Sequence, residues 1–373
     1  MTLTQRVKEE ARRLGFQLVG VTTPDPPPRF AVYEHWLSQG YHGGMGYLAR
    51  ERARSLRADP KRILPDCQSV IVLGACYPGL NLVPEIPKGA LHGLVASYAC
   101  SEDYHTVLPT RLHTLVEFIE QQVAHPFSYR YYTDTGAILE RDFAQRAGLG
   151  WIGKNSNLIN PRLGSYIFLA EILLGIELRP DEPHVEDRCG TCTRCIDACP
   201  TGCILPGRMI DARKCISYLT IEHRGPIPVC LRPMLGKWVF GCDVCQQVCP
   251  WNQRFAPRRE DSLFQLSLDI AYPDLIEELS LTSQDFNRKF KLCPVQRTKH
   301  RGYLRNVAVA LGNARDPRST QPLALALRNS EPLVRRHAAW ALNQMGGYAA
   351  YQALQKARET EKDPDVLEEI GLG

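Results

Sequence analysis

The chain has 373 residues, enough for two or three domains that each bury a core. Hydrophobic residues make up 44% and charged residues 23% of it, proportions that are ordinary for a soluble globular protein. The sequence contains no run of the roughly 20 apolar residues that a membrane span needs. The net charge of +5 is mild, so the local distribution of charge is more informative than the total.

Residues 1–178 predict a mixed α/β domain. Apolar residues recur at helical spacing in the first 14 positions, which predicts an amphipathic helix. Short apolar or aromatic runs predict strands at residues 18–21, 69–73, 129–133 and 166–172. The third of these runs ends at Asp134-Thr135-Gly136, and a helix is predicted from there through Ala147.

Residues 179–256 carry a distinctive pattern of cysteines. Cys189-x2-Cys192-x2-Cys195-x3-Cys199-Pro200 has the full spacing of bacterial ferredoxins, in which the Cys before Pro ligates the other cluster. A second run, Cys242-x2-Cys245-x3-Cys249-Pro250, adds three thiols. Two [4Fe–4S] clusters need eight thiolates and the two runs supply seven, so Cys203, Cys215 and Cys230 are the candidates for the eighth.

Zinc sites and disulfides are the alternative uses of the 14 cysteines. Zinc knuckles need two Cys pairs, not a run of this kind. The polar start MTLTQRVKEEARRLG has no apolar segment typical of an export signal, which favours reduced thiols in the cytoplasm. The pattern therefore predicts two [4Fe–4S] clusters. Four isolated cysteines are interpreted as small buried apolar side chains: Cys67, Cys76, Cys100 and Cys293.

Residues 257–373 are predicted to be helical. The segment 305–311 is echoed at 336–342, an offset of 31 residues, which suggests two stacked helix pairs of a short HEAT-like solenoid, with coincidental Ala-rich helices as the alternative. No acidic residue occurs between Phe286 and Ala314. The basic residues of that stretch predict a surface for a polyanion, or a solvated helix face: Arg288, Lys289, Lys291, Arg297, Lys299, Arg301 and Arg305.

The glycine-rich segment Gly148-x-Gly150-x-x-Gly153 matches a dinucleotide-binding fingerprint in spacing alone. The fingerprint requires a strand before it and a helix after it, whereas a helix is predicted before this segment. A nucleotide site of that kind is therefore not favoured.

Several ordered motifs together resemble the epoxyqueuosine reductases. They are the segments 132–136, 148–155, 199–202, 215–220 and 241–252. The resemblance is close over residues 1–256 and extends to the HEAT-like tail of longer family members. It implies an α+β multidomain protein with three domains. Residues 1–178 would form an α/β cobalamin-binding catalytic domain, and residues 179–256 a ferredoxin-like domain with two [4Fe–4S] clusters. Residues 257–373 would form a C-terminal α-helical, HEAT-like tRNA-binding domain.

The resemblance also implies an activity. The family reduces epoxyqueuosine to queuosine at the wobble position of tRNA, the last step of queuosine synthesis, with cobalamin and two [4Fe–4S] clusters. An external low-potential electron donor is then expected as a partner. We also expect a cytoplasmic monomer that does not associate with membranes.

The resemblance assigns the cluster ligands. Cluster one would be bound by Cys189, Cys192, Cys195 and Cys249. Cluster two would be bound by Cys199, Cys215, Cys242 and Cys245. Cys203 and Cys230 would then be non-ligands, although both are close to ligands in the sequence.

Removal of an epoxide oxygen takes two electrons and two protons, and the oxygen leaves poorly unless an acid protonates it. Asp134 is the acid that the resemblance favours. It ends the aromatic run of Tyr129, Tyr131 and Tyr132, and burial against those rings would raise its pKa and keep the carboxyl protonated. The alternative, from the sequence alone, is that Asp134 caps the following helix.

The resemblance also places Asp134 beside the cobalamin, together with further positions that match family segments: Arg57, Lys154, Asn155, Leu158, Leu169, Ser217, Asp243 and Val244. A small residue is also expected beside the corrin, with Ala96, Ser97 and Cys100 as open alternatives. The Asp103-Tyr104-His105 segment lacks the glycine of a D-x-H-x-x-G motif, so a histidine ligand to cobalt is not expected.

The basic stretch is expected to contact tRNA phosphates, with Arg297, Lys299, Arg301 and Arg305 along the stem, while the wobble base is splayed into a pocket. One alternative function is that of a corrinoid reductase acting on a small molecule, which would not need the basic helical tail. Another is that of a non-catalytic electron carrier, which would not need a corrin.

Overall fold

The structure, a computed structural model, describes residues 1–79, 91–256 and 263–371. The chain forms two compact units, each built from segments that are distant in the sequence. Unit 1 consists of residues 1–82, 102–213 and 244–265. Unit 2 consists of residues 83–101, 214–243 and 266–373.

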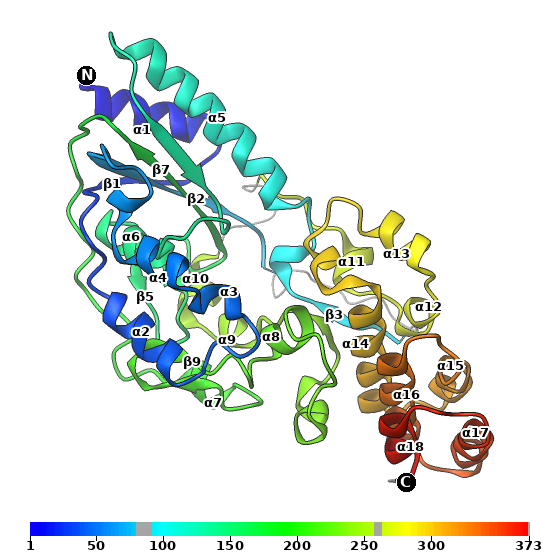
Figure 1. Ribbon diagram of the computed structural model, residues 1–373. Helices are drawn as coiled ribbons and strands as arrows, with labels where there is room; N and C mark the ends of the chain where they lie inside the picture. The colour runs from blue at the N-terminus through cyan, green and yellow to red at the C-terminus, as the bar shows by residue number, and fades with distance from the viewer. Residues whose placement is uncertain (80–90, 257–262, 372–373) are drawn as a thin grey trace. The chain divides into compact units, whose positions relative to one another are not determined.

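Unit 1 is organised around a four-stranded antiparallel sheet. Its strands, in spatial order, are β1 (Leu18–Thr22), β2 (Ser69–Cys76), β7 (Ile167–Leu174) and β4 (Tyr129–Tyr132). Helices α1 (Leu3–Arg13) and α5 (Tyr104–Gln122) cover one face, and α6 (Glu140–Arg146) lies on the other (Figure 1). Because both faces are covered, every residue of β2 is buried.

The core of unit 1 follows from strand alternation. Val70 and Val72 of β2 pack with Phe143 of α6 on one face of the sheet, so the alternate residues Ile71 and Leu73 face the layer of α1 and α5. Full burial of each such side chain contributes roughly 1.5–3 kcal/mol. The four predicted strands and the first helix are confirmed, with bounds that differ by a few residues.

Shorter elements complete unit 1. They are α2 (Phe30–Ser38), α3 (Gly46–Ala49), α4 (Glu51–Ala58), β5 (Trp151–Ile152), β6 (Leu158–Ile159), α7 (Arg194–Asp197), β8 (Ile204–Leu205), β9 (Met209–Ile210), α9 (Val244–Gln247) and α10 (Pro250–Phe255). The glycine-rich segment leads into the hairpin of β5 and β6. A Cβ at Gly150 would lie 2.1 Å from the Ile159 carbonyl oxygen, so this glycine is needed for backbone packing.

The cysteine-bearing segment, predicted as a domain at 179–256, contributes to both units. Residues up to 213 and from 244 onward belong to unit 1, and residues 214–243 belong to unit 2. The physical reason is its composition of short helices, two-residue strands and turns. Such a segment buries too little apolar surface to form a core, so each part packs onto a larger neighbour.

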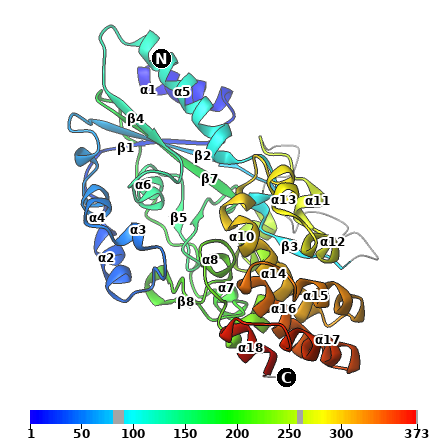
Figure 2. The ribbon, with the colours of Figure 1, turned by 45° about the vertical axis from the view of Figure 1, so that its right-hand side comes forward.

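Unit 2 combines a small parallel strand pair with stacked helices. The strands are β3 (Leu94–Val95) and β10 (Trp238–Phe240). The helices are α8 (Ile216–Ile221), α11 (Leu268–Ala271), α12 (Leu275–Leu279), α13 (Ser283–Lys289), α14 (Lys299–Ala314), α15 (Thr320–Ala326), α16 (Pro332–Met345), α17 (Tyr348–Arg358) and α18 (Pro364–Gly371). Figure 2 shows α15 to α18 stacked beside α14. A helical tail is confirmed for the described residues from 263 onward.

The two echoed segments lie on α14 and α16, which pack directly against each other. A Cβ at Gly312 would lie 2.8 Å from the Cα of Ala341, so glycine is required where these helices approach most closely. The internal echo therefore reflects a real helix pair. Across the three described ranges, no helix is both long and apolar enough to cross a bilayer.

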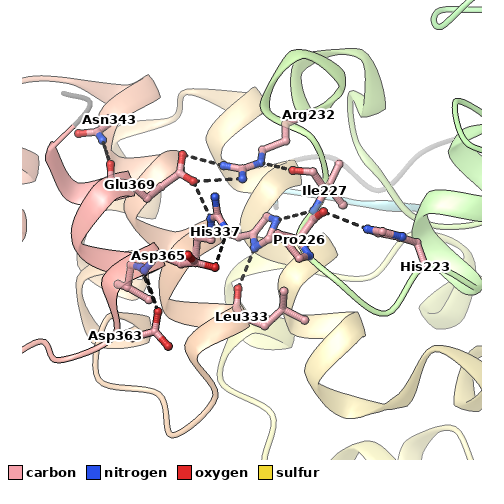
Figure 3. A network of polar contacts seen from close by, with 12 residues as sticks. His223, Pro226, Ile227, Arg232, Leu333, His337, Asn343, Asp363, Asp365 and Glu369 are labelled. Atoms are coloured by element: carbon pink, nitrogen blue, oxygen red, sulfur yellow. Dashed lines mark hydrogen bonds and ion pairs between the residues drawn. The ribbon is translucent and has the colours of Figure 1, made fainter. Parts of the chain in front are cut away.

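A buried ionic network ties the end of the chain to the loop that precedes β10 (Figure 3). Arg232 donates to both carboxylate oxygens of Glu369 in α18, at 2.8 and 3.1 Å, and both side chains are 1% exposed. His337 of α16 contacts the Leu333 carbonyl through Nδ1 at 2.7 Å and accepts from the Ile227 N–H through Nε2 at 3.1 Å. Burial lowers the pKa of His337 well below its ordinary value, which keeps the ring neutral.

We expect Arg232→Met to lower the free energy of unfolding of unit 2 by about 3–5 kcal/mol. The substitution removes the guanidinium that balances the charge of the buried Glu369 carboxylate. Anaerobic urea unfolding followed by circular dichroism would measure the loss. Arg318→Met is the matched control, since it breaks the more exposed pair with Asp316 and should cause no measurable shift. Equal behaviour of the two variants would contradict a structural role for the buried pair.

Candidate active site

Asp134 lies where β4 leaves the sheet. The preceding residue, Thr133, is buried and donates its hydroxyl to the Leu169 carbonyl at 2.9 Å. Asp134 then adopts a left-handed backbone conformation with φ of +54°, which aspartate tolerates better than most residues. Its N–H donates to Oε1 of Glu140 at 2.7 Å. Helix α6 begins at Glu140 with Leu139 as its N-cap, so Asp134 is not the cap of that helix.

The side chain of Asp134 is 59% exposed, so the expected burial against the aromatic run is wrong. Asp134 follows the edge strand β4 in a left-handed turn, where its side chain is open to solvent. The Tyr104 hydroxyl donates to Oδ2 at 2.8 Å, and Nε2 of His105 lies 3.7 Å from the same oxygen. Hydrogen-bond donors at the start of α5 therefore surround the carboxyl.

His105 is held in a charged state by its neighbours. Its Nδ1 lies 2.7 Å from Oδ1 of Asp103, the N-cap of α5. Burial disfavours the imidazolium, but hydrogen bonds to Asp103 and Asp134 outweigh that effect and raise the pKa of His105 to about 9. This group is not among the residues predicted from the sequence. The Asp103-Tyr104-His105 segment lacks a cobalt-ligand motif, but its spacing places a helix cap, a phenol and an imidazole on one helical turn.

Two further carboxyls lie close to Asp134. Burial, together with the Asp134 charge, raises the pKa of Glu140. Burial also raises the pKa of Glu171 on β7 well above its ordinary value, with Glu140 and Asp134 adding to the effect. Glu171 is fully buried. Burial and the neighbouring like charges thus favour the protonated forms of Glu140 and Glu171.

Asp134 and Arg57 line the same cavity, which has a volume of about 360 Å³. The guanidinium of Arg57 lies 5.7 Å above the Tyr33 ring, and its Nη1 donates to the Ala53 carbonyl at 3.2 Å. The cavity is also lined by cations and aromatic rings: Arg29, Arg141, Arg208, Tyr33, Trp36 and Tyr47. The structure thus brings together two predicted site residues that are 77 positions apart in the sequence.

The four predicted ligands of cluster one line a second cavity, of about 230 Å³, within unit 1. Trp151 donates its indole N–H to Sγ of Cys189 at 3.4 Å. Among the described residues, no group of three or more His, Cys, Asp or Glu side chains is close enough to bind a single metal ion. The four thiols of cluster one line a cavity rather than converging on one point. Four thiols from two separate segments around one cavity fit a [4Fe–4S] cluster.

The predicted ligands of cluster two are divided between the units. Cys199 and Cys245 belong to unit 1, and Cys215 and Cys242 belong to unit 2. Sγ of Cys203 lies 3.5 Å from Sγ of Cys199, whereas Cys230 is exposed in unit 2. The four isolated cysteines, Cys67, Cys76, Cys100 and Cys293, are buried as predicted.

Lys154 and Asn155, predicted near the corrin, contact the cysteine loops. Lys154 Nζ donates to the Gly190 and Cys192 carbonyls at 2.7 and 2.9 Å. Asn155 donates to the Cys245 carbonyl at 3.4 Å. These contacts indicate that the hairpin of β5 and β6 holds the cluster-binding segments in place.

The remaining predicted corrin contacts lie on several elements. Leu158 is buried in the core beneath the sheet, and Leu169 packs against that core. In unit 2, the buried Asp243 carboxylate accepts hydrogen bonds from the N–H and hydroxyl of Ser97, at 2.7 and 2.5 Å, and Ser217 lies on α8. Val244, in unit 1, begins α9. Of the three small residues considered, Ser97 is thus bonded to a predicted corrin contact.

The predicted tRNA-binding residues are exposed, with one exception. Arg288, Lys289, Lys291, Arg297, Lys299 and Arg301 all lie on the surface of unit 2. Some are paired, for example Arg297 with Glu222 and Lys289 with Glu278. Arg305 was a wrong prediction, because it is 0% exposed and donates to the carbonyls of Leu219, His223 and Gly225. Its guanidinium cannot reach a phosphate while it satisfies buried backbone groups.

Family models match three parts of the chain. A 4Fe-4S double cluster binding domain matches residues 188–252, epoxyqueuosine reductase QueG matches residues 57–135, and HEAT repeats match residues 296–372. Among curated relatives, the epoxyqueuosine reductase of Pseudomonas aeruginosa is 40% identical over 349 residues, which cover 92% of this chain and 95% of that protein. The Escherichia coli enzyme is 39% identical over 343 residues, covering 92% and 89%.

Solved structures agree with these relatives. A crystal structure of epoxyqueuosine reductase with an epoxyqueuosine-modified tRNA-Tyr stem loop is 31% identical, with a TM-score of 0.90 and coverage of 99% of this chain and 97% of that chain. The Streptococcus thermophilus epoxyqueuosine reductase is 28% identical, with a TM-score of 0.89 and coverage of 100% and 98%. The identity of this chain to characterised reductases, sustained over nine-tenths of its length, shows that it belongs to the epoxyqueuosine reductase family.

Proposed function

We propose that this chain reduces epoxyqueuosine to queuosine at the wobble position of tRNA, with Asp134 as the proton donor to the epoxide oxygen. The observation that carries the proposal is the placement of Asp134 in a cavity, within reach of Tyr104 and His105. A solved Bacillus subtilis relative, with a TM-score of 0.89, is described with its catalytic loop swung out of the active site. The exposed, left-handed turn at Asp134 suits a loop of that kind.

The cofactors of the reaction are two [4Fe–4S] clusters and cobalamin. The double-cluster family match covers the cysteine segment, and four of its thiols line one cavity. Residues of unit 1 offer suitable chemistry for a corrin: the partly buried, apolar Leu169 for the ring, and Arg57 for its polar rim. When bound, these groups would supply single electrons and a strongly reducing cobalt centre.

The residues of this chain handle the protons. Opening of the epoxide places negative charge on its oxygen, and Asp134 donates a proton there. His105, charged at neutral pH, is a proton source 3.7 Å from Asp134, and Tyr104 fixes the orientation of the carboxyl. Because Asp134 is exposed, water can also return its proton. Two electrons and two protons then yield the alkene and water.

The partners form the rest of the proposal. The tRNA contacts the exposed basic residues of unit 2, without Arg305. Two single-electron deliveries by an external low-potential donor supply the reducing equivalents. We further propose that the enzyme acts as a monomer in the cytoplasm, where tRNA is modified.

The activity can be tested by anaerobic reconstitution with iron, sulfide and cobalamin, followed by addition of a strong reductant and mass analysis of nucleosides from epoxyqueuosine-containing tRNA. Wild-type protein should convert the nucleoside to queuosine. Asp134→Asn should bind tRNA and cobalamin normally and turn over about 10²–10⁴-fold more slowly, because the amide cannot protonate the oxygen. Asp66→Asn, which changes a carboxylate bonded to Ser128, is the control. Near-normal turnover by Asp134→Asn would remove this residue from the mechanism.

The pH profile tests the role of His105. Its raised pKa means that the proton is present below about pH 9 and lost above it, so wild-type turnover at saturating tRNA should fall as the pH rises through 9. His105→Gln should be slower at neutral pH and lack this decline. His113→Gln, on the same helix and beside Glu117, should keep the wild-type profile. If the turnover of His105→Gln still falls as the pH rises through 9, the titration of another group causes the decline.

Charge reversal tests the tRNA surface. The triple variant Lys291→Glu, Lys299→Glu, Arg301→Glu should weaken tRNA binding and flatten the salt dependence of the affinity, because each lost phosphate contact lowers the logarithmic slope by roughly 0.7–0.9. The control triple, Lys356→Glu, Arg358→Glu, Lys362→Glu, changes exposed residues on and after α17. If the salt slope is unchanged in the first variant, the RNA binds elsewhere.

A further inference from the structure

The cavity of cluster one has a cationic rim. Besides the four cysteines, it is lined by Lys154, Arg188, Arg194 and Arg254. Among the described residues that line it, none is acidic. Arg188, Arg194 and Arg254 are exposed, and Lys154 is half-buried. The positive charge therefore lies at the surface, around the mouth of the thiol-lined cavity.

Neighbouring acidic residues neutralise only part of this rim, chiefly at Arg188. Glu186 pairs with Arg188 at 2.6 Å, and Asp187 pairs with Arg208, outside the cavity, at 2.5 Å. Asp197 accepts from the Thr193 hydroxyl at 2.7 Å. The charges of Arg194 and Arg254, which come from helices α7 and α10, remain to act on an approaching molecule.

The same segment has surface features that suit a brief protein encounter. Gly190 and Thr191, next to the cluster ligands, are exposed, so a partner could come close to the thiols. Val185 and Ile196 expose 85% and 37% of their surfaces, which gives apolar area beside the charges. Weak redox complexes bury small interfaces and depend on charge complementarity for their association rate.

We propose that this rim is the docking surface for a small acidic one-electron carrier protein, which delivers electrons to cluster one. The proposal rests on the proposed function, since it concerns the external donor of that reaction. A cluster bound by four thiolates is anionic, so an acidic carrier would be repelled unless cations lay between the two. In each encounter the carrier loses one electron and cluster one gains it, and two encounters supply the pair that the reduction needs.

The test uses the reconstituted holoenzyme and a reduced acidic [2Fe–2S] ferredoxin as the probe. The variant Arg194→Glu, Arg254→Glu should slow cluster reduction, followed by stopped-flow absorbance and electron paramagnetic resonance, by roughly ten-fold at low salt. The difference should shrink as ionic strength rises, because salt screens exposed charges. Calorimetry should show weaker binding of the oxidised ferredoxin. Arg188 is left unchanged because its reversal would place two carboxylates together at Glu186.

Two controls separate docking from other effects. Arg12→Glu, Arg52→Glu makes the same change in net charge at exposed positions of α1 and α4 and should leave the rate unchanged. Photoreduced deazariboflavin, a small uncharged reductant, should reduce both variants at the wild-type rate.

The outcomes are distinct. If both charge-reversal variants slow cluster reduction by ferredoxin equally, the effect comes from net charge, and the proposal is overturned. If reduction by deazariboflavin is slowed as well, the arginines act on the reduction potential of the cluster, and the proposal is also overturned. Unaltered ferredoxin kinetics would also overturn it. Failure of the wild type to produce queuosine with a strong chemical reductant would instead refute the proposed function, because that assay needs no carrier.

Discussion

The cluster-binding segments of unit 1 depend on polar anchoring to its α/β core, because they bury too little apolar surface to hold themselves in place. The ammonium of Lys154 fixes the loop between Cys189 and Cys192 through two carbonyls. The buried amide of Asn252 binds the Ser165 N–H at 2.6 Å and the Gln246 carbonyl at 2.9 Å. The Lys154 and Ser165 contacts join cysteine segments to the hairpin of β5 and β6 and to the chain just before β7. The Gln246 contact holds the second cysteine segment together. The position of the thiols is thus set by the rigidity of the α/β core.

The same core positions Asp134, the proposed proton donor. Strand β4 ends one residue before Thr133, whose buried hydroxyl is bonded to β7, and the left-handed turn at Asp134 follows. Helix α5, from the opposite layer, presents Tyr104 and His105 at its N-terminus. The Asp134 carboxyl accepts a hydrogen bond from Tyr104 and lies 3.7 Å from His105, whose raised pKa makes it a nearby proton source that does not require burial of Asp134. Exposure of Asp134 also leaves room for a bulky substrate such as a tRNA loop.

Unit 2 uses arginine in two physically different ways. Arg232 and Arg305 are buried and satisfy carboxylates or backbone carbonyls, which ties the solenoid helices to the loops around residues 219–232. Arg301, one helical turn before Arg305, is exposed and lies 3.9 Å from Glu331. Sequence charge alone does not separate these uses, because both residues belong to one basic run on α14. Only the exposed members can contribute to binding a polyanion.

The sequence by itself determined the iron–sulfur chemistry, the strands and the helical tail. Thiol spacing along one segment is a local property, and so are the apolar periods that predict β2 or α1. It could not predict that Asp134 would be exposed, that Arg305 would be buried, or that Lys154 would anchor the cysteine loops. Nor did it reveal the cationic rim, whose members are up to 100 residues apart in the chain. These features were decided by tertiary structure, because exposure and charge environment depend on which distant segments pack together.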